Sequence, residues 1–286
     1  MADMNTGHFK HDITEAPKSK AVFDLFSLKG KTAIVSGAGA GIGLAAEAGA
    51  NVAIWYNSNK KALEEAANIE KTYGVKCKAY QVNVATWDTV KDAVDEIVKE
   101  FNGRLDIFVA NSGITWEDGP FIDGPIETMH KVFKINIDGT LFSARAAALH
   151  WRRQKKEGTT VDGQPLDNYS YGSFIATSSM SAHITNIPQQ QTVYNASKAC
   201  INQACKSLAV EWVGFARANT ISPGYINTDL SAFIPPTTKN LFKSLIPMGR
   251  EGETHELKGA YLYLASDASS YTTGTDIIID GGYCVP

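Results

Sequence analysis

The stretch SGAGAGIGLAAEAGANVAIWY, residues 36–56, decides the fold. Glycines at positions 37, 39, 41 and 43 directly follow the β-branched run TAIVSG. A glycine turn between a buried strand and a helix lets the backbone approach a pyrophosphate, and the helix N-terminus supplies N–H donors. The strict GxGxxG spacing is absent, but the turn follows a strand and opens a βαβ pattern. We therefore predict a dinucleotide-binding turn formed by Gly37, Gly41, Ile42 and Gly43.

The segment that closes this unit is unusually short. Only LAAEAGAN separates Gly43 from Val52 in the next apolar run. A strand of about five residues spans about 17 Å, and a helix returning along it at about 1.5 Å per residue needs about 11 residues. The crossover from Ser36 to Asn51 still exceeds the minimum of about a dozen residues for a parallel connection. We expect a shortened or stretched helix, lost packing beneath the turn, and weaker cofactor affinity or stability; a misread exon boundary would give the same short stretch.

Seven β-branched apolar runs alternate with segments of helical period. The runs are 32–37, 51–56, 76–82, 105–111, 172–179, 216–223 and 276–280. Continuous apolar strands separated by helices are typical of a parallel sheet that helices cover on both faces. We predict a single α/β Rossmann-type doubly wound domain with a seven-stranded parallel sheet over residues 21–286, after a flexible arm over 1–20. The polar stretch 158–172 is expected to form a surface loop or short hairpin.

Composition excludes several classes of protein. The 286 residues carry a net charge of -3, which gives no electrostatic reason to bind nucleic acid or an anionic membrane. No apolar run approaches the roughly 18 residues that a membrane span needs. The four cysteines are scattered and form no CxxC pair, which predicts reduced thiols and a cytoplasmic protein. No metal site is predicted, and His8 and His11 are expected to be solvated.

Cofactor preference is set near the end of the second predicted strand. A carboxylate there would bind the ribose 2′-hydroxyl of NADH and repel the 2′-phosphate of NADPH. The sequence instead reads YNSNKK over residues 56–61, and no carboxylate occurs before Glu64. We predict NADPH, with Asn57 and Ser58 as neutral donors, although the two lysines are equally compatible with a solvated helix start.

A candidate catalytic pair stands in YNASKAC, where Tyr194 and Lys198 are spaced i to i+4. This spacing puts both on one helix face. A nearby ammonium lowers a tyrosine pKa from its usual value of about 10, which suits Tyr194 as a general acid toward a carbonyl oxygen. His183 lies nearby, but the sequence shows no partner that would support it as a base. The preceding strand ends with hydroxyls placed to hydrogen-bond the same oxygen, from Ser178, Ser179 and Ser181.

Together these motifs resemble those of the short-chain dehydrogenases/reductases over residues 28–286. The resemblance rests on SGAGAGIG, NSG (111–113), KINIDG around Asn136, SS…YNASK, SPGYINT (222–228) and DGGY (280–283). Within the family, VAIWYNS, NIPQ, EWVGFAR and IDGGYCVP are similar to the fungal group of sorbose reductase, NADP-dependent mannitol dehydrogenase and L-xylulose reductase. Members usually carry a longer segment between the last glycine and the second strand.

The resemblance implies a role for each matching residue. Tyr194 is the proton donor, Lys198 binds the nicotinamide ribose and tunes Tyr194, and Asn136 holds a water that links Lys198 to solvent. The family commonly has its serine at the position of Ser181, whereas the longer spacing of the fungal group points to Ser179, which we predict. The other implied cofactor contacts are Asn83, Val84, Asn111, Gly113, Pro223, Gly224, Ile226 and Thr228.

The resemblance implies reversible hydride transfer between NADPH and the carbonyl of a ketose, giving a polyol. The candidate substrates are L-sorbose, D-fructose and L-xylulose. It also implies a homotetramer built through the long helices around Asn136 and Tyr194 and through the C-terminal strand. Two alternatives stay open: reduction of a bulkier secondary-metabolite ketone, and a non-catalytic NADPH-binding scaffold, which the short helix motivates. The complete set of Asn136, Ser179, Tyr194 and Lys198 speaks against the scaffold.

Overall fold

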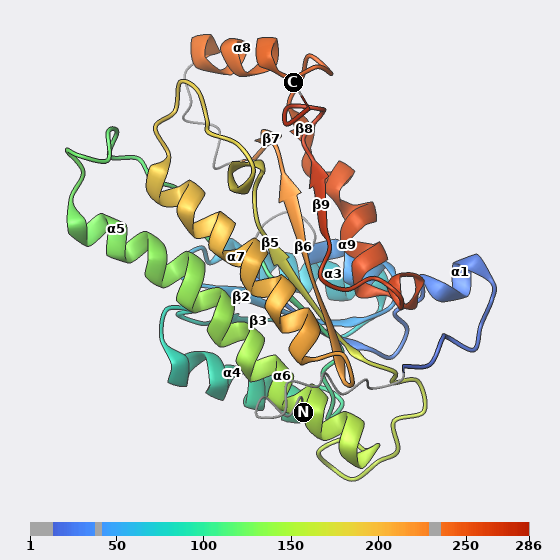
Figure 1. Cartoon of the computed structure of the whole chain (residues 1–286). Helices are drawn as coiled ribbons and strands as arrows, with labels where there is room; N and C mark the ends of the chain where they lie inside the picture. Colours follow the sequence, from blue (N-terminus) through green and yellow to red (C-terminus); the bar gives the residue numbers. More distant parts are fainter. Residues whose placement is uncertain (1–13, 38–41, 229–235, 286) are drawn as a thin grey trace, which may run out of the picture.

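The computed structural model describes residues 14–37, 42–228 and 236–285, which contain a seven-stranded parallel sheet (Figure 1). The order across the sheet is β3-β2-β1-β4-β5-β6-β9. The predicted doubly wound fold is confirmed, and every predicted apolar run contains one of these strands. The seven strands are β1 (Thr32–Ser36), β2 (Asn51–Tyr56), β3 (Cys77–Gln81), β4 (Ile107–Ala110), β5 (Gly172–Thr177), β6 (Ala216–Pro223) and β9 (Asp276–Ile279).

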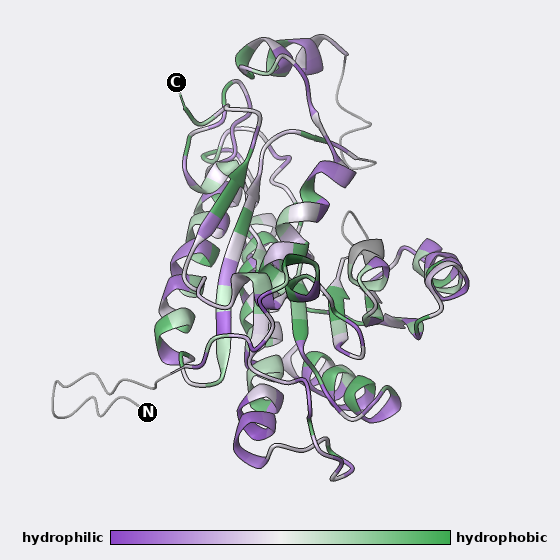
Figure 2. Ribbon diagram, turned by 90° about the vertical axis from the view of Figure 1, so that its right-hand side faces the viewer, coloured by the Kyte–Doolittle hydropathy of each residue, from purple (hydrophilic) through white to green (hydrophobic). Residues whose placement is uncertain are grey.

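Helices cover both faces of the sheet. One face packs against α4 (Trp87–Glu100), α6 (Gly139–Glu157) and α7 (Thr192–Glu211). The other packs against α2 (Ile42–Glu47), α3 (Lys61–Tyr73) and α9 (Lys258–Ala265). All five residues of β1 are buried, because a central parallel strand meets helices on both sides. Figure 2 shows the central strands as largely apolar.

Several shorter elements surround this core. The pair β7 (Ile226–Asn227) and β8 (Gly252–Glu253) forms a separate parallel ladder. The remaining elements are α1 (Val22–Leu25), α5 (Ile126–Phe133), the π-helix η1 (Lys134–Asp138), α8 (Pro236–Leu245) and the 3₁₀ helices η2 (Met180–Ala182), η4 (Thr254–Leu257) and η5 (Asp267–Ser269).

The short crossover closes, as the sequence predicted. Helix α2 has six residues, fewer than two turns, yet β1 and β2 pair in parallel from Thr32 opposite Asn51 onward. The helix ends at Glu47, and in the turn that follows, Gly49 has a φ of +93° and its N–H donates to Ala46 O at 2.9 Å. Ala45 and Ala46 are buried against the sheet. The lost packing and weaker affinity expected from this shortening stay predictions.

The described part of the N-terminal arm lies against the domain. The backbone N–H of Glu15 donates to the Tyr171 hydroxyl at 3.1 Å, and α1 follows a few residues later. The polar stretch 158–172 contains an isolated antiparallel bridge between Thr159 and Pro165, which fits the expected loop or short hairpin. Within residues 14–37, 42–228 and 236–285, no helix is long and apolar enough to cross a bilayer.

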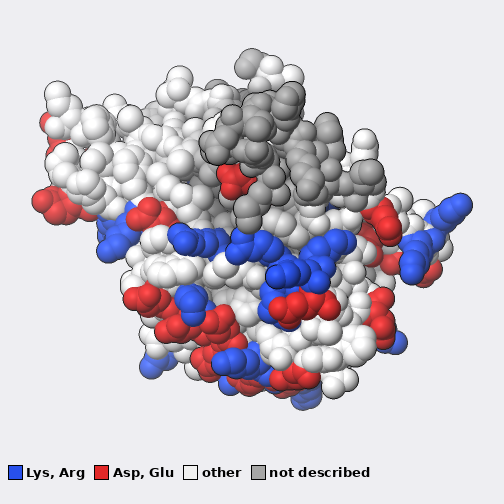
Figure 3. All heavy atoms as spheres, turned by 60° about the horizontal axis from the view of Figure 1, so that its bottom comes forward, with Lys and Arg blue, Asp and Glu red and all other residues white. Residues whose placement is uncertain are grey.

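Charged side chains of both signs lie intermingled on the face shown in Figure 3. Ion pairs among the described residues include Lys78 with Glu100 at 2.7 Å and Lys91 with Asp95 at 2.8 Å. Among the described residues no group of three or more His, Cys, Asp or Glu side chains is placed to hold a metal ion.

Candidate active site

The carboxyl ends of β1 and β4 meet where the strand order reverses, which is the place where open α/β sheets bind nucleotides. Gly37 follows β1 with a φ of +75°, and a Cβ atom there would lie 2.9 Å from the Cα of Ser112. Asn111 follows β4, and its Nδ2 donates to Gly37 O at 3.0 Å. The two predicted cofactor residues are therefore in contact, and position 37 admits only glycine without strain.

The rest of the predicted phosphate turn is less fully placed. Ile42 and Gly43 are the first two residues of α2, so both lie at the N-terminus of this helix. Gly41 lies outside the described residues. The lack of a Cβ at Gly37 lets the backbone of Ser112 pack against it, which holds together the turns after β1 and β4 at the sheet edge where a pyrophosphate would bind.

Tyr194 and Lys198 lie one turn apart on α7, beside the end of β5. Lys198 is 4 % exposed, and its Nζ donates to Thr177 O at 2.8 Å. The same Nζ lies 5.6 Å from the centre of the Tyr194 ring. Burial lowers the pKa of Lys198 to about 8, because the charged ammonium loses water. An amine with this pKa exchanges protons near neutral pH.

The pKa of Tyr194 is raised in this structure, whereas the sequence predicted that it is lowered. Burial raises the pKa of Tyr194 above its ordinary value, and a hydrogen bond with Ser179 partly opposes that rise. The spacing in the sequence predicted that the two side chains lie on one helix face. It could not predict that the Lys198 ammonium donates to the carbonyl of Thr177. Tyr194 is therefore held as a neutral phenol, which is the form that donates a proton.

The two candidate serines make different contacts. Ser179 caps η2: its Oγ accepts from the backbone N–H of Ser181 at 3.1 Å, and its side chain hydrogen-bonds Tyr194. The Ser179 oxygen accepts from this backbone N–H, and its hydroxyl proton remains available to donate to another oxygen. The hydroxyl of Ser181 instead donates to Asn186 Oδ1 at 2.9 Å. Geometry thus brings Ser179, and not Ser181, to Tyr194.

Asn136 sits in the π-helix η1, fully buried. Its Oδ1 accepts from the N–H of Ile114 at 2.9 Å, and its Nδ2 donates to the O of Ile114 and to the Oγ of Ser197, each at 3.0 Å. A Cβ atom at Gly113 would lie 3.3 Å from Asn136 Oδ1 and 3.5 Å from Lys198 Nζ. Gly113 therefore lets the β4 turn, Asn136 and Lys198 approach one another.

The predicted adenine end is more open. Asn57 and Ser58 are exposed after β2, as donors to a solvent-facing phosphate would be. The Oδ1 of Asn83 accepts from the N–H of Ala85 at 3.1 Å, so part of its carbonyl is already engaged. Val84 is 8 % exposed and lies under Gly139 of α6, so its side chain is a core contact.

The segment after β6 carries the residues predicted to lie at the nicotinamide. Gly224 donates to Ile279 O at 2.9 Å, and a Cβ there would lie 2.6 Å from the Cα of Asp280. Pro223 ends β6, Ile226 begins β7, and Thr228 follows it, all partly buried. The four predicted nicotinamide-side residues thus lie together on one short segment beside the C-terminal turn.

Sequence reasoning missed a partner for His183. Its Nε2 lies 2.6 Å from Asp276 Oδ2, across 93 residues of sequence. Asp276 begins β9, and its side chain is 10 % exposed. The only signal in the sequence was an acidic residue at the start of a predicted strand, which by itself indicates nothing.

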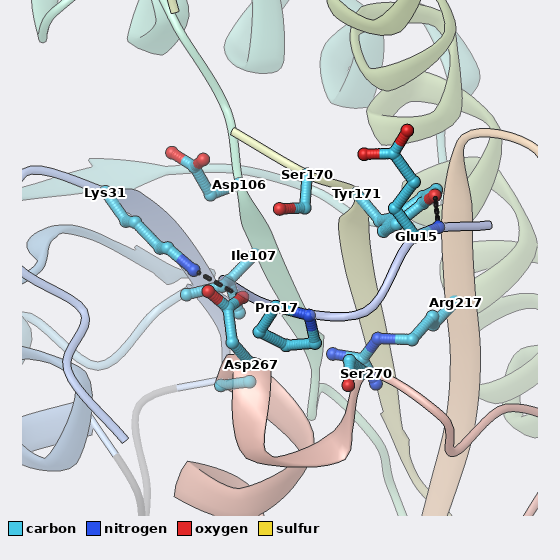
Figure 4. A pocket seen from close by; sticks show the side chains of 11 residues that line it. Glu15, Pro17, Lys31, Asp106, Ile107, Ser170, Tyr171, Arg217, Asp267 and Ser270 are labelled. Carbon is cyan, nitrogen blue, oxygen red and sulfur yellow. Dashed lines mark hydrogen bonds and ion pairs between the residues drawn. The ribbon is translucent and has the colours of Figure 1, made fainter. Parts of the chain in front are cut away.

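A separate hollow lies at the amino edge of the sheet, away from these residues (Figure 4). Its lining includes both acids and bases, but Lys31 is paired with Asp267 at 3.0 Å. Arg217 donates to the backbone oxygens of Thr272, at 3.1 Å, and Leu264, at 2.9 Å. Because these cations are already satisfied within the chain, the hollow offers no comparable place for a phosphate.

Comparison with known proteins assigns the class. Residues 34–284 match the family model described as enoyl-(acyl carrier protein) reductase. The chain belongs to this family, and the resemblance to short-chain dehydrogenases/reductases predicted from the sequence is confirmed. It is an oxidoreductase with a Rossmann-type fold.

Individual relatives narrow the comparison. The chain is 65 % identical over 288 residues to an L-xylulose reductase of Hypocrea jecorina, covering 99 % of this chain and 100 % of the relative. It is 50 % identical over 280 residues to a probable NADP-dependent mannitol dehydrogenase of Yarrowia lipolytica, covering 96 % and 95 %. The structure matches that of the NADPH-dependent 3-quinuclidinone reductase of Rhodotorula rubra, with a TM-score of 0.85, 41 % identity and coverage of 98 % and 100 %.

The first of these matches also bears on the short crossover. It runs over 288 positions, whereas this chain has 286 residues, of which 99 % take part. The relative therefore has residues for which this chain has no counterpart. This agrees with a segment shortened in this chain relative to other family members.

Proposed function

We propose that the protein is an NADPH-dependent reductase that converts a ketose reversibly to its polyol. The observation that carries the proposal is the contact of Tyr194 with Ser179 at the end of β5, with Lys198 buried beside them. These groups supply a neutral proton donor, a second hydroxyl and an amine that titrates near neutral pH. A protein that only bound nucleotide would require none of these three.

NADPH is the cofactor that the site favours. Neutral and basic side chains follow β2 where an NADH-specific member would have a carboxylate, and Asn57, Ser58 and Lys60 are all exposed there. The mannitol dehydrogenase relative is NADP-dependent by name, and the quinuclidinone reductase is NADPH-dependent by name. Gly37, Asn111 and Lys198 would hold its phosphate and ribose groups.

The chain's own residues provide the proton chemistry. Bound NADPH supplies a hydride to the carbonyl carbon of the ketose. The Ser179 hydroxyl donates a hydrogen bond to the carbonyl oxygen, and Tyr194 Oη transfers its proton to that oxygen, which leaves a phenolate. The Lys198 ammonium then stabilises the phenolate and returns a proton to it. Gly113 lets Asn136 and Lys198 come close to each other. Asn136 would hold a water on the proton path from Lys198 to solvent.

The substrate candidates are L-xylulose, D-fructose and L-sorbose. The first follows from the L-xylulose reductase relative, the second from the mannitol dehydrogenase relative, and the third from the similarity to sorbose reductases. A bulkier ketone is the second candidate, because the Rhodotorula structure belongs to a 3-quinuclidinone reductase. Comparing kcat/KM for the ketoses and 3-quinuclidinone with the same enzyme separates these candidates.

Assembly as a homotetramer forms part of the proposal. The support is apolar side chains exposed on the two long helices: Leu141 and Leu149 of α6 are 37 % and 40 % exposed, and Val210 of α7 is 58 % exposed. Ile278 of β9, on the edge strand, is 41 % exposed. Light scattering coupled to gel filtration tests the mass of the assembly.

Four free cysteines support a reducing, cytoplasmic location, which imaging of a tagged chain tests.

The deciding experiment titrates the protein with NADPH by fluorescence, with NADH as the control, and then adds each ketose. Oxidation of NADPH on addition of a ketose supports the proposal, and Tyr194→Phe should abolish turnover while NADPH still binds. Binding without turnover of any ketone would favour the scaffold. Absence of binding by folded protein would show that the short crossover disables the cofactor site.

A further inference from the structure

His183 joins the serine turn to the last strand of the sheet. Its backbone N–H donates to Met180 O at 2.9 Å, so it ends the η2 helix that Ser179 begins. Its ring Nε2 lies 2.6 Å from Asp276 Oδ2 on β9. The turn that carries Ser179 is therefore fastened at its far end to an element remote in sequence.

Asp276 is the fixed side of this contact. Its side chain is 10 % exposed and accepts from the Ser222 hydroxyl at 2.8 Å and from the Thr220 hydroxyl at 2.6 Å, both on β6. Nδ2 of Asn202, one turn beyond Lys198 on α7, donates to it at 3.3 Å. A carboxylate with this many donors is held rigidly, so Asp276 keeps its position and fixes that of His183.

The ring chemistry gives the direction of the contact. A carboxylate only accepts, so His183 Nε2 carries the hydrogen and donates to Asp276. Asn202 Nδ2 lies 3.0 Å from this Nε2 and 3.3 Å from Asp276 Oδ2; because a protonated Nε2 cannot accept, the amide hydrogen of Asn202 is donated to the carboxylate. The contact is one charge-assisted hydrogen bond, which is shorter and stronger than a neutral one.

We propose that His183 and Asp276 are positioning residues that hold the Ser179 hydroxyl against Tyr194. The η2 helix has only three residues and two fixed ends: Ser178 Oγ donates to Lys198 O at 3.2 Å at its start, and His183 is bound to Asp276 at its end. Releasing the far end lets the turn move, and Ser179 moves with it. This inference rests on the proposed reductase function and deepens it.

The test compares His183→Ala with His183→Gln in the purified full chain. Alanine removes the donor, and kcat for ketose reduction should fall by about ten- to a hundredfold, because small misplacements of a positioning group cost that much. The KM for NADPH should change little, since the phosphate turn lies on β1. Glutamine places a donor near the former Nε2 and should restore most of kcat.

A pH profile separates positioning from general loss of structure. The Ser179 hydrogen bond lowers the pKa of Tyr194, so His183→Ala should move the rise of polyol oxidation to higher pH. Lys198 is the other titratable group near that ring, at 5.6 Å, and it is unchanged in the variant. The apolar residues that belong to the same cluster as Tyr194, including Met129 and Phe133, do not titrate.

His150→Ala is the matched control. His150 Nε2 contacts Asp95 Oδ1 at 2.8 Å between α6 and α4, so a second histidine–aspartate contact is removed far from Ser179. It should lower thermal stability without moving the pH profile. If wild type reduces a ketose but His183→Ala and His150→Ala behave alike, the inference is overturned. If wild type reduces no ketose, the proposed function fails first, so the two failures are distinguishable.

Discussion

Replacing Gly37 with alanine tests the cofactor turn most sharply, because the chain offers a matched glycine elsewhere. Gly37 has a φ of +75°, and a Cβ there would lie 2.9 Å from the Cα and N of Ser112. Gly74, which ends α3, has a φ of +66° but nothing within 4 Å of its Cβ position. The two substitutions therefore share the backbone strain and differ only in the steric overlap.

The expected losses follow from these two terms. The left-handed backbone costs alanine about 1–2 kcal/mol at either position. Overlap with rigid backbone at position 37 adds about 1–3 kcal/mol, as overpacking in a core does. Gly37→Ala should therefore lower the free energy of unfolding by about 2–5 kcal/mol, and Gly74→Ala by about 1–2 kcal/mol.

Urea unfolding at one protein concentration measures both losses, and NADPH titration by fluorescence supplies the second readout. Gly37→Ala should also weaken NADPH binding, because relief of the overlap must move the turn after β1 or the turn after β4. Gly74→Ala should bind NADPH as wild type does. Equal losses of stability, together with unchanged binding in both variants, would refute the steric reasoning about position 37.

Three further predictions concern charge and protonation. Polyol oxidation should rise toward alkaline pH while ketose reduction stays nearly level across neutral pH, because burial raises the pKa of Tyr194 and oxidation requires its phenolate; initial rates in both directions measure this. Lys198 has a folded-state pKa of about 8 against an ordinary 10.5, so the unfolded chain holds the proton between these values. Below pH 8 the buried Lys198 ammonium destabilises the folded state by its full amount. The free energy of unfolding of the apoenzyme, measured with urea, should therefore rise between pH 8 and 10.5 by about 3 kcal/mol more in wild type than in Lys198→Met. Ser58→Asp should raise the Kd for NADPH about tenfold, since like charges about 4 Å apart cost about 1 kcal/mol even in water, and should leave the Kd for NADH unaffected or lower.

The strands could be predicted from the sequence because each lies in the interior of a parallel sheet. Such strands are apolar on both faces, so TAIVS and NVAIWY read as continuous runs, and Gly37 marks where the first of them ends. The placement of Tyr194 and Lys198 on one face of α7 followed from helix geometry alone. These features depend on residues that are neighbours in the chain.

The parts that could not be predicted depend on contacts between distant segments. Asp276 and His183 are 93 residues apart, so no local pattern joins them. The choice between Ser179 and Ser181 is made by the η2 turn, in which one hydroxyl faces Tyr194 and the other donates to Asn186. The direction of the Tyr194 pKa depends on burial, which spacing along a helix does not report.

The fold also separates the shortened crossover from the proton chemistry. Helix α2 packs with α3 and α9 on one face of the sheet, whereas α7 and its Lys198 belong to the opposite face. Ser179 and Tyr194 are fixed by β5, η2 and α7, whereas the main contacts of α2 are with β2, α3 and α9. Shortening α2 should therefore act on cofactor affinity through the β1 turn and leave proton transfer to a bound ketose intact. A raised KM for NADPH with an ordinary pH profile is the signature that this arrangement predicts.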